Sequence, residues 1–361
     1  MDIELIGFAA PWGIYAFILA LHVLVPAHKV RGYARHPETD EPLGYRLNGL
    51  PVMLLTVGAW AGACRLGWLP WDWLWTHRWS SLAGAFTLGM LFSIAIMVGA
   101  PSTGRGVLVE FFLGRRENPQ TPGGRVDAKM FLYLVGATML ALNLLSFAAH
   151  HVLVFGSAAS LGVLLHVALF GWFLLDYLFF ERVHLYTYDL FAERVGFKLG
   201  WGCLTFYPYF YSVGLWNVAD QPSPERGMLW LSAGAIVFFA GWMLARGANM
   251  QKFFFKLDPS HVFLGIFEPE TVQDRSQALL CSGFWGLSRH INYLGEILMA
   301  TGLAWVLGWP AALGPWMYPL YYVLLLVPRE RDDHRRCAAK YGALWEAYCR
   351  RVRYRIIPGV Y

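Results

Sequence analysis

The stretch 82-LAGAFTLGMLFSIAIMVGA-100 decides the fold class of this 361-residue chain. It is a nearly unbroken apolar run, and a helix needs roughly 18 or more such residues to cross a hydrocarbon layer about 30 Å thick. Two further runs, Leu161–Phe180 and Met228–Ala245, have the same character. The sequence therefore predicts helices that span a membrane.

The composition supports this prediction over the whole chain. Hydrophobic residues make up 57% and charged residues only 15%, with a mean hydropathy of +0.42. A soluble domain carries about 25% charged residues, so this chain has too few to cover a soluble globule. Secreted disulfide scaffolds, coiled coils, disordered tails and soluble nucleic-acid binders are excluded together.

The apolar segments predict an all-α, polytopic transmembrane helical bundle with about nine or ten spans. We place nine of them at residues 5–26, 48–71, 80–102, 130–148, 157–180, 199–217, 227–246, 294–309 and 312–327. The last two are short and are separated by Trp309-Pro310. No repeat or flexible linker divides the chain, so we expect a single domain over residues 1–361.

Basic residues predict the orientation, because Lys and Arg accumulate in cytoplasmic loops. With the N-terminus outside, the inner segments are 27–47, 103–129, 181–198, 246–293 and 328–361, and they hold 26 of the 29 basic residues. The net charge of +5 then reflects topology and contact with membrane lipids, and no nucleic-acid partner is expected. We predict an integral, multi-pass membrane protein whose long polar segments face the cytoplasm.

Cysteines and short motifs exclude several kinds of site. The five cysteines are scattered and form no CxxC pair, so the sequence predicts neither a disulfide framework nor a metal site. GxGxxG, Walker, HExxH and GxSxG motifs are all absent. A dinucleotide would therefore have to be held without a Rossmann fold.

Three polar segments are candidates for chemistry. The tail from Arg329 to Tyr341 could anchor to anionic lipid or, with Trp345 and Tyr348 nearby, hold phosphates and a flat base. Ser282–Glu296 places polar groups at the mouth of a span, where such groups are costly and usually face a cavity. The third segment, Glu181–Tyr211, is either a site or an ordinary helix start with interfacial aromatics.

These segments resemble a known family, the membrane sterol reductases that reduce Δ14 or Δ7 double bonds with NADPH, including the sterol-reductase-like domain of lamin B receptor. The resemblance covers roughly residues 40–361 and depends on several motifs in order. They are Tyr45–Leu50, Glu110–Pro119 with Asp127 and Lys129, Thr187–Tyr211, Ser282–Glu296 and Arg329–Tyr361.

The resemblance implies an NADPH pocket that faces the cytoplasm. Its residues would be Lys252, Lys256, Leu280, Trp285, Asn292, Tyr293, Arg329, Asp333, Cys337, Lys340, Tyr341 and Tyr348. Residues 1–198 would then supply the N-terminal helices, and residues 199–361 the substrate cavity and the NADPH-binding half. Cationic side chains would hold the phosphates, and aromatic and amide groups would orient the rings.

The resemblance also implies the reaction, which is reduction of a carbon–carbon double bond in a sterol or related polycyclic isoprenoid. An isolated alkene has no electrophilic carbon, so an acid must protonate it before hydride can add. Tyr211 and Asp333 are the implied catalytic proton-relay pair. Residues expected to line the substrate site are Asp189, Trp201, Tyr207 and Glu296.

Two alternatives stay open at this stage. Membrane methyltransferases of the isoprenylcysteine type share the Arg-His…Tyr and acidic–aromatic C-terminal pattern, but they use S-adenosylmethionine and are much shorter. A catalytically silent sterol-binding scaffold is favoured by Cys203, which stands where the family usually has Asp. The sequence leaves open which double bond is reduced, the natural substrate, the effect of Cys203 and the oligomeric state.

Overall fold

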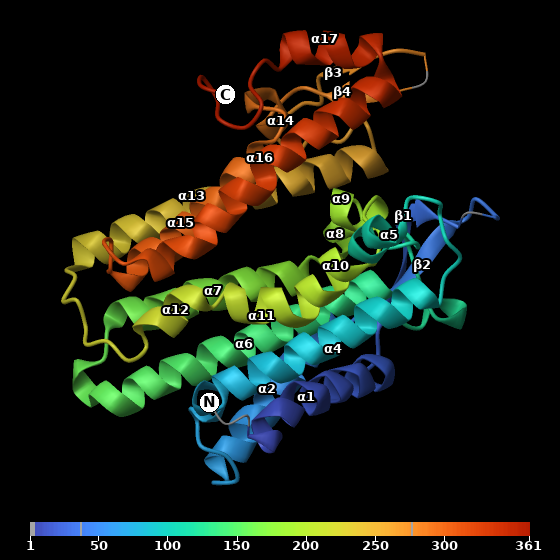
Figure 1. Ribbon diagram of the computed structural model, residues 1–361. Coiled ribbons are helices and arrows are strands. Elements are labelled where there is room, and N and C mark those ends of the chain that lie inside the picture. Colours follow the sequence, from blue (N-terminus) through green and yellow to red (C-terminus); the bar gives the residue numbers. More distant parts are fainter. Residues whose placement is uncertain (1–3, 37, 276) are drawn as a thin grey trace. The chain divides into compact units, whose positions relative to one another are not determined.

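The computed structural model describes residues 4–36, 38–275 and 277–361. The chain forms two compact units, Met1–Ser223 and Pro224–Tyr361, and each is described here by itself (Figure 1). The segment 197–218 belongs to the first unit. The expected single reductase domain over residues 1–361 stays a prediction.

The long helices of the first unit coincide with five of the predicted spans. They are α1 (Leu5–Leu24), α2 (Gly49–Arg65), α4 (Arg78–Val98), α6 (Ala128–Phe155) and α7 (Leu161–Phe179). Helix α6 is the central one, because 83% of an 18-residue apolar stretch within it is buried. It contacts α2, α7 and α11 (Tyr207–Phe210).

Short elements connect these helices. They are the antiparallel hairpin of β1 (His28–Arg35) and β2 (Pro42–Leu47), and the helices α3 (Trp73–Thr76), α5 (Val107–Leu113), η1 (Pro122–Gly124), η2 (Gly156–Ala158), α8 (Glu181–His184) and α9 (Tyr188–Phe191). The polar segments 27–47 and 103–129 therefore fold into defined structure rather than extended loops.

The second unit contains four longer helices, a short β-hairpin and a short helix. The helices α13 (Met228–Leu257), α15 (Ile291–Leu307), α16 (Leu313–Tyr341) and α17 (Ala343–Arg351) follow one another along the chain. Strands β3 (Thr271–Gln273) and β4 (Ala278–Leu280) pair antiparallel, and the short helix α14 (Phe284–Leu287) follows them. The predicted span 312–327 continues without a break into the charged tail, because both belong to α16.

The prediction of an all-α, polytopic membrane protein is confirmed. Among the described residues, five helices are long and apolar enough to cross a membrane: Leu5–Leu24, Arg78–Val98, Ala128–Ala158, Leu161–Phe179 and Met228–Leu257. On α4, Phe86, Leu91 and Ile94 are 43–50% exposed. Exposing apolar surface to water costs about 25 cal/mol per Å², and lipid removes this cost. The predicted spans 48–71 and 294–309 form the shorter apolar helices α2 and α15.

The predicted span 199–217 is a broken helix. It consists of α10 (Phe197–Trp201), the π-helical turn η3 (Gly202–Phe206), α11 and α12 (Val213–Val218). Pro208 has no N–H to donate to the carbonyl of Leu204, and Tyr15 Oη donates to that carbonyl instead at 2.6 Å. Asn143 Nδ2 donates to the carbonyl of Pro208 at 2.9 Å. Irregular backbone at membrane depth is tolerated where protein groups satisfy it, and here neighbouring helices do so.

Helices α13 and α15 approach each other closely through small residues. A Cβ built on Gly241 would lie 2.6 Å from both the carbonyl oxygen of Gly295 and the backbone nitrogen of Met299. Both neighbours are backbone atoms, which cannot rotate away. Small residues at such contacts let membrane helices pack tightly when apolar burial offers no driving force between them.

We therefore expect Gly241→Ala to lower the melting temperature of the purified protein, with a loss of about 1–3 kcal/mol in stability from overpacking. The matched control is Gly171→Ala on α7, where an added Cβ meets nothing within 4 Å. Thermal unfolding in detergent compares the two. Equal melting temperatures for the two variants would contradict the close helix contact.

Candidate functional site

One face of α16 carries a group of polar and charged residues. Arg329, Asp333, Arg336, Cys337 and Lys340 recur three or four positions apart, which places them on one side of a continuous helix. The helix runs unbroken from Leu313 to Tyr341, although Pro319 and Pro328 each lack a backbone N–H donor. This face carries Arg329, Asp333, Cys337 and Lys340, four of the residues predicted for the cofactor pocket.

Positive charges from several elements surround Asp333. Burial raises the pKa of the Asp333 carboxyl above its ordinary value, and the nearby charges of Lys252, Arg329 and Arg336 act in the opposite direction. Lys252, from α13, also lies over the ring of Trp285 at 5.3 Å. Two further cations, Lys256 and Lys340, lie close enough to each other for their charges to repel. A polyanion would relieve this repulsion.

The imidazole of His290 lies inside the same group of charges. Burial, followed by the positive charges of Lys252 and Arg289, lowers the pKa of His290 to about 3. His290 is therefore neutral at physiological pH. Its Nε2 lies 3.7 Å from Oδ2 of Asp333.

Aromatic and thiol side chains of α16 and α17 pack together. Trp345 stacks on Tyr348 with ring centroids 5.1 Å apart and on Tyr341 at 6.5 Å. Together with Cys281 and Val352 they form a small core, against which Cys337 packs. Burial and the charge of Asp333 raise the pKa of Cys337 to about 12, so it is a neutral thiol. Tyr348 and Leu280 are buried, and Tyr341 is half-buried.

Several buried polar atoms in this region make no hydrogen bond to any residue described. They include Arg289 Nε, His290 Nε2 and Asn292 Oδ1. Buried polar groups are normally satisfied, so these atoms have hydrogen-bonding capacity that a polar ligand could use. Asn292 is held by a hydrogen bond from its Nδ2 to Oδ1 of Asn249 at 3.4 Å. The donors and cations present therefore fit a phosphorylated cofactor.

Every residue expected at the NADPH pocket lies in the second unit, on α13, β4, α14, α15, α16 or α17. Tyr293 stacks on His290 at 4.8 Å. Glu296 lies one turn after Asn292 on the same face of α15. The pocket residues that the sequence predicted are thus carried by elements of one compact unit.

The remaining expected residues lie in the first unit, mostly on the broken helix. The rings of Tyr207 and Tyr211 meet edge to face with centroids 4.6 Å apart. Trp201 stacks on Phe197 at 5.0 Å, and its buried Nε1 has no hydrogen-bond partner within the described chain. Cys203 is buried in the π-helical turn. Asp189 lies on α9, a separate short helix.

Lys129 fixes the segment that carries Asp189. Its side chain is only 1% exposed, and its ammonium donates to the carbonyls of Leu190 at 2.6 Å and Glu193 at 2.8 Å. The neighbouring Asp127 caps α6 by accepting from the N–H of Met130 at 2.9 Å. The family motif pointed to both residues, and the structure shows that both position backbone.

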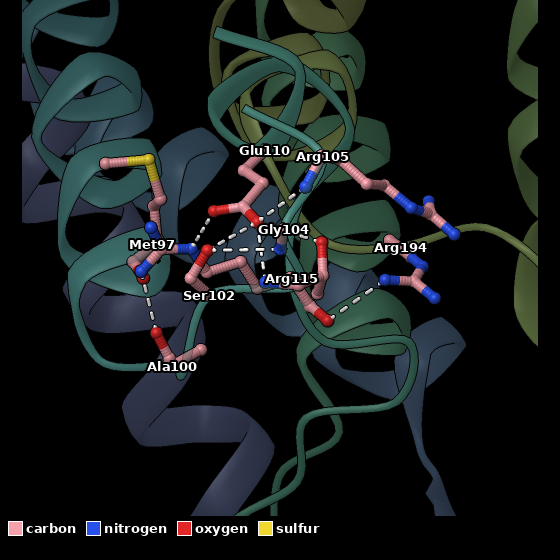
Figure 2. Close-up of polar contacts among 9 residues, drawn as sticks. Met97, Ala100, Ser102, Gly104, Arg105, Glu110, Arg115 and Arg194 are labelled. Carbon is pink, nitrogen blue, oxygen red and sulfur yellow. Dashed lines mark hydrogen bonds and ion pairs between the residues drawn. The ribbon is translucent and has the colours of Figure 1, made fainter. Parts of the chain in front are cut away.

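Glu110 ties together the loop that follows α4 (Figure 2). Its Oε1 accepts from the hydroxyl of Ser102 at 2.8 Å and from the backbone N–H and hydroxyl of Thr103 at 2.5 and 2.9 Å. Its Oε2 accepts from Nε of Arg115 at 2.7 Å. Arg115 in turn donates to the carbonyls of Met97 and Ala100 at 3.0 and 2.8 Å, closing the end of α4. The motif residues Glu110 and Arg115 therefore hold this loop in place.

We expect Glu110→Gln to loosen this loop, because the amide cannot accept from every donor and carries no charge for Arg115. Deuterium exchange of the peptide around Thr103 should rise several-fold, whereas Glu117→Gln, which removes an exposed ion pair with Arg194, should leave it unchanged. Equal exchange in both variants would contradict the structural role of Glu110.

The structure of the same loop should be insensitive to mild acid. Burial alone would raise the pKa of Glu110, but the hydrogen bonds from Ser102, Thr103 and Arg115 lower it from 4.5 to about 2. A lowered folded-state pKa means that the stabilisation is complete above the unfolded value and is lost only as pH falls towards 2. Protection at Thr103, corrected for intrinsic exchange, should therefore be equal at pH 7 and pH 5.

The apolar helices and the structured polar segments define this chain as an integral, polytopic membrane protein. Its sequence matches the model of the ergosterol biosynthesis ERG4/ERG24 family over residues 5–361. The chain belongs to this family. The resemblance to membrane sterol reductases that the motifs indicated is confirmed.

Several characterised relatives align over most of the chain. A Delta(14)-sterol reductase of Arabidopsis thaliana is 30% identical over 359 residues, covering 96% of this chain and 94% of that protein. A Delta(14)-sterol reductase of Methylotuvimicrobium alcaliphilum is 31% identical over 373 residues, covering 98% and 83%. The Delta(14)-sterol reductase TM7SF2 of Mus musculus is 32% identical over 375 residues, covering 98% and 86%.

Proposed function

We propose that this protein is an oxidoreductase that reduces a carbon–carbon double bond of a sterol with NADPH as the hydride donor. The observation that carries the proposal is the cationic face of α16, within a chain whose relatives are named Delta(14)-sterol reductases. The Δ14 bond is accordingly the first substrate to test, ahead of Δ7 and Δ24.

The second unit would hold the cofactor. Lys252, Arg329 and Lys340 would contact phosphates, and Lys256 would favour a 2′-phosphate and hence NADPH over NADH. Trp285 and Tyr293 would flank the rings, and the unpartnered Oδ1 of Asn292 would accept from an amide or hydroxyl. The cofactor supplies hydride when bound, and the pocket residues position it.

The proton that adds to the alkene would come from a side chain of the protein. Tyr211 and Asp333 are the residues proposed for proton transfer, and the acid would protonate the alkene to give a tertiary carbocation that hydride would quench. The aromatic face of Trp201 would stabilise the developing positive charge. Asp189, Tyr207 and Glu296 are the proposed substrate-lining residues.

The distribution of Lys and Arg along the chain supports the proposal that this pocket opens to the cytoplasm. All five segments assigned to the inner side together hold 26 of the 29 basic residues, and the pocket residues come from the last two of these segments and their adjoining helices. A water-soluble cofactor would then reach the pocket from the cytoplasm, and the sterol would reach it from the membrane.

Product analysis tests this function. Purified protein is incubated with NADPH, NADH or S-adenosylmethionine and a panel of Δ14, Δ7 and Δ24 sterols, and the products are identified by mass spectrometry. The proposal predicts a gain of two hydrogens with NADPH and less product with NADH. Methylated product with S-adenosylmethionine would overturn it in favour of a methyltransferase. Sterol binding without NADPH oxidation would indicate a silent scaffold.

A further inference from the structure

His290 is fixed in place on three sides. Its backbone N–H donates to the carbonyl of Arg355 at 2.8 Å, and the N–H of Arg289 donates to the carbonyl of Tyr354 at 3.0 Å. Its ring stacks on Tyr293 with an interplanar angle of 20°. The backbone of this segment is therefore fixed by two hydrogen bonds, and the ring is packed in one orientation against Tyr293.

In that orientation the imidazole points at the proposed acid. Nε2 of His290 lies 3.7 Å from Oδ2 of Asp333, and His290 is only 5% exposed. Nε2 makes no hydrogen bond to any described residue. A buried ring nitrogen aimed at a carboxyl, just beyond bonding distance, matches catalytic contacts that tighten only when the ligand is bound.

The charges facing the pair come from three elements. Lys252 faces it from α13, Arg289 precedes α15, and α16 contributes the set Arg329, Glu330, His334 and Arg336. The excess of positive charge opposes protonation of the imidazole. A neutral imidazole has one N–H, which it can give to a carboxylate from Nε2 if Nδ1 is unprotonated.

We propose that His290 is the positioning residue for Asp333, donating Nε2–H to Oδ2 so that the second carboxyl oxygen stays directed at the reaction. This inference rests on the proposed function, in which Asp333 takes part in proton transfer. Because His290 is neutral, it orients the carboxyl without adding to the cations that bind phosphate. The hydrogen bond also favours the ionised carboxylate and so limits the rise of the Asp333 pKa.

Two amide substitutions of His290, to glutamine and to asparagine, distinguish this positioning role from a merely structural one. The Nε2 of glutamine in His290→Gln reaches about as far as Nε2 of the imidazole, whereas the shorter amide in His290→Asn reaches only about as far as Nδ1. We expect His290→Asn to lower kcat by about 10- to 100-fold, the range for a hydrogen bond to a charged group. His290→Gln should retain most of kcat. The dissociation constant for NADPH should stay within about twofold in both variants, because neither changes a phosphate contact.

The pH profile gives a second readout. Losing the donor raises the pKa of Asp333, so the fall of kcat on the basic side should begin at higher pH in His290→Asn than in the wild type. His290→Gln should follow the wild type. Equal kcat and equal profiles for the two amides, whether both high or both low, would overturn the positioning role.

The variant Asp333→Asn distinguishes a failure of the positioning role of His290 from a failure of the proposed function. If Asp333→Asn is inactive while both His290 amides behave as wild type, only the positioning role fails. If Asp333→Asn retains full turnover, the assignment of the acid fails instead.

Discussion

Replacing Asp333 by asparagine should reduce turnover of a Δ14-unsaturated sterol by about 10²- to 10⁴-fold, the usual contribution of a general acid or base. The amide has nearly the same shape but cannot supply a proton. NADPH affinity should not fall, because the lost negative charge lies beside Lys252, Arg329 and Arg336 and would repel phosphates. Single-turnover kinetics with saturating NADPH measures the chemical step directly.

The neighbouring aspartate provides the matched control. Asp332 is exposed and pairs with Arg335, so Asp332→Asn should keep wild-type turnover. Tyr211→Phe, which removes the other residue proposed for proton transfer, should resemble Asp333→Asn. Full turnover in both Asp333→Asn and Tyr211→Phe would place the acid elsewhere.

Reversing the charge of Lys252 or Arg329 should weaken NADPH binding by at least about tenfold, since each change replaces an attractive contact with phosphate by a repulsive one. The melting temperature without cofactor should stay close to that of the wild type. A Lys252→Glu variant would also lose the cation over Trp285. Titration of NADPH by intrinsic fluorescence or calorimetry measures the change.

Arg353→Glu is the corresponding control, because Arg353 is an exposed cation of the same unit outside the α16 face. Its NADPH affinity should match the wild type at physiological salt, where exposed charges more than about 8–10 Å apart are largely screened. An equal loss for all three variants would indicate a general charge effect and not a defined pocket.

Much of the fold follows from local sequence properties. Long apolar runs predict α4, α6, α7 and α13, because a helix satisfies its own backbone in lipid. The broken helix was not predictable from hydropathy, since η3 depends on Pro208 and on distant partners such as Tyr15 and Asn143. The β1–β2 hairpin was also missed, because β1 carries four basic or histidine side chains among eight residues and has no regular alternation of apolar side chains.

The candidate site was predictable to a similar degree. The run of charged residues from Arg329 to Arg336 is enough by itself to indicate a polar helical segment, but because the run is unbroken it does not show which face forms the site. Family motifs drew attention to Glu110 and Lys129 without revealing that both hold backbone. The approach of His290 to Asp333 joins residues that are distant in the sequence, so no local pattern reports it.

The source of the two added hydrogens tests the central claim most directly. Purified protein is given a Δ14-unsaturated sterol with NADPH deuterated at the transferable position of nicotinamide C4, and separately with unlabelled NADPH in D₂O. We expect one deuterium in the product from each experiment, at the two different carbons of the former double bond. Product that carries no deuterium from the labelled NADPH would contradict it.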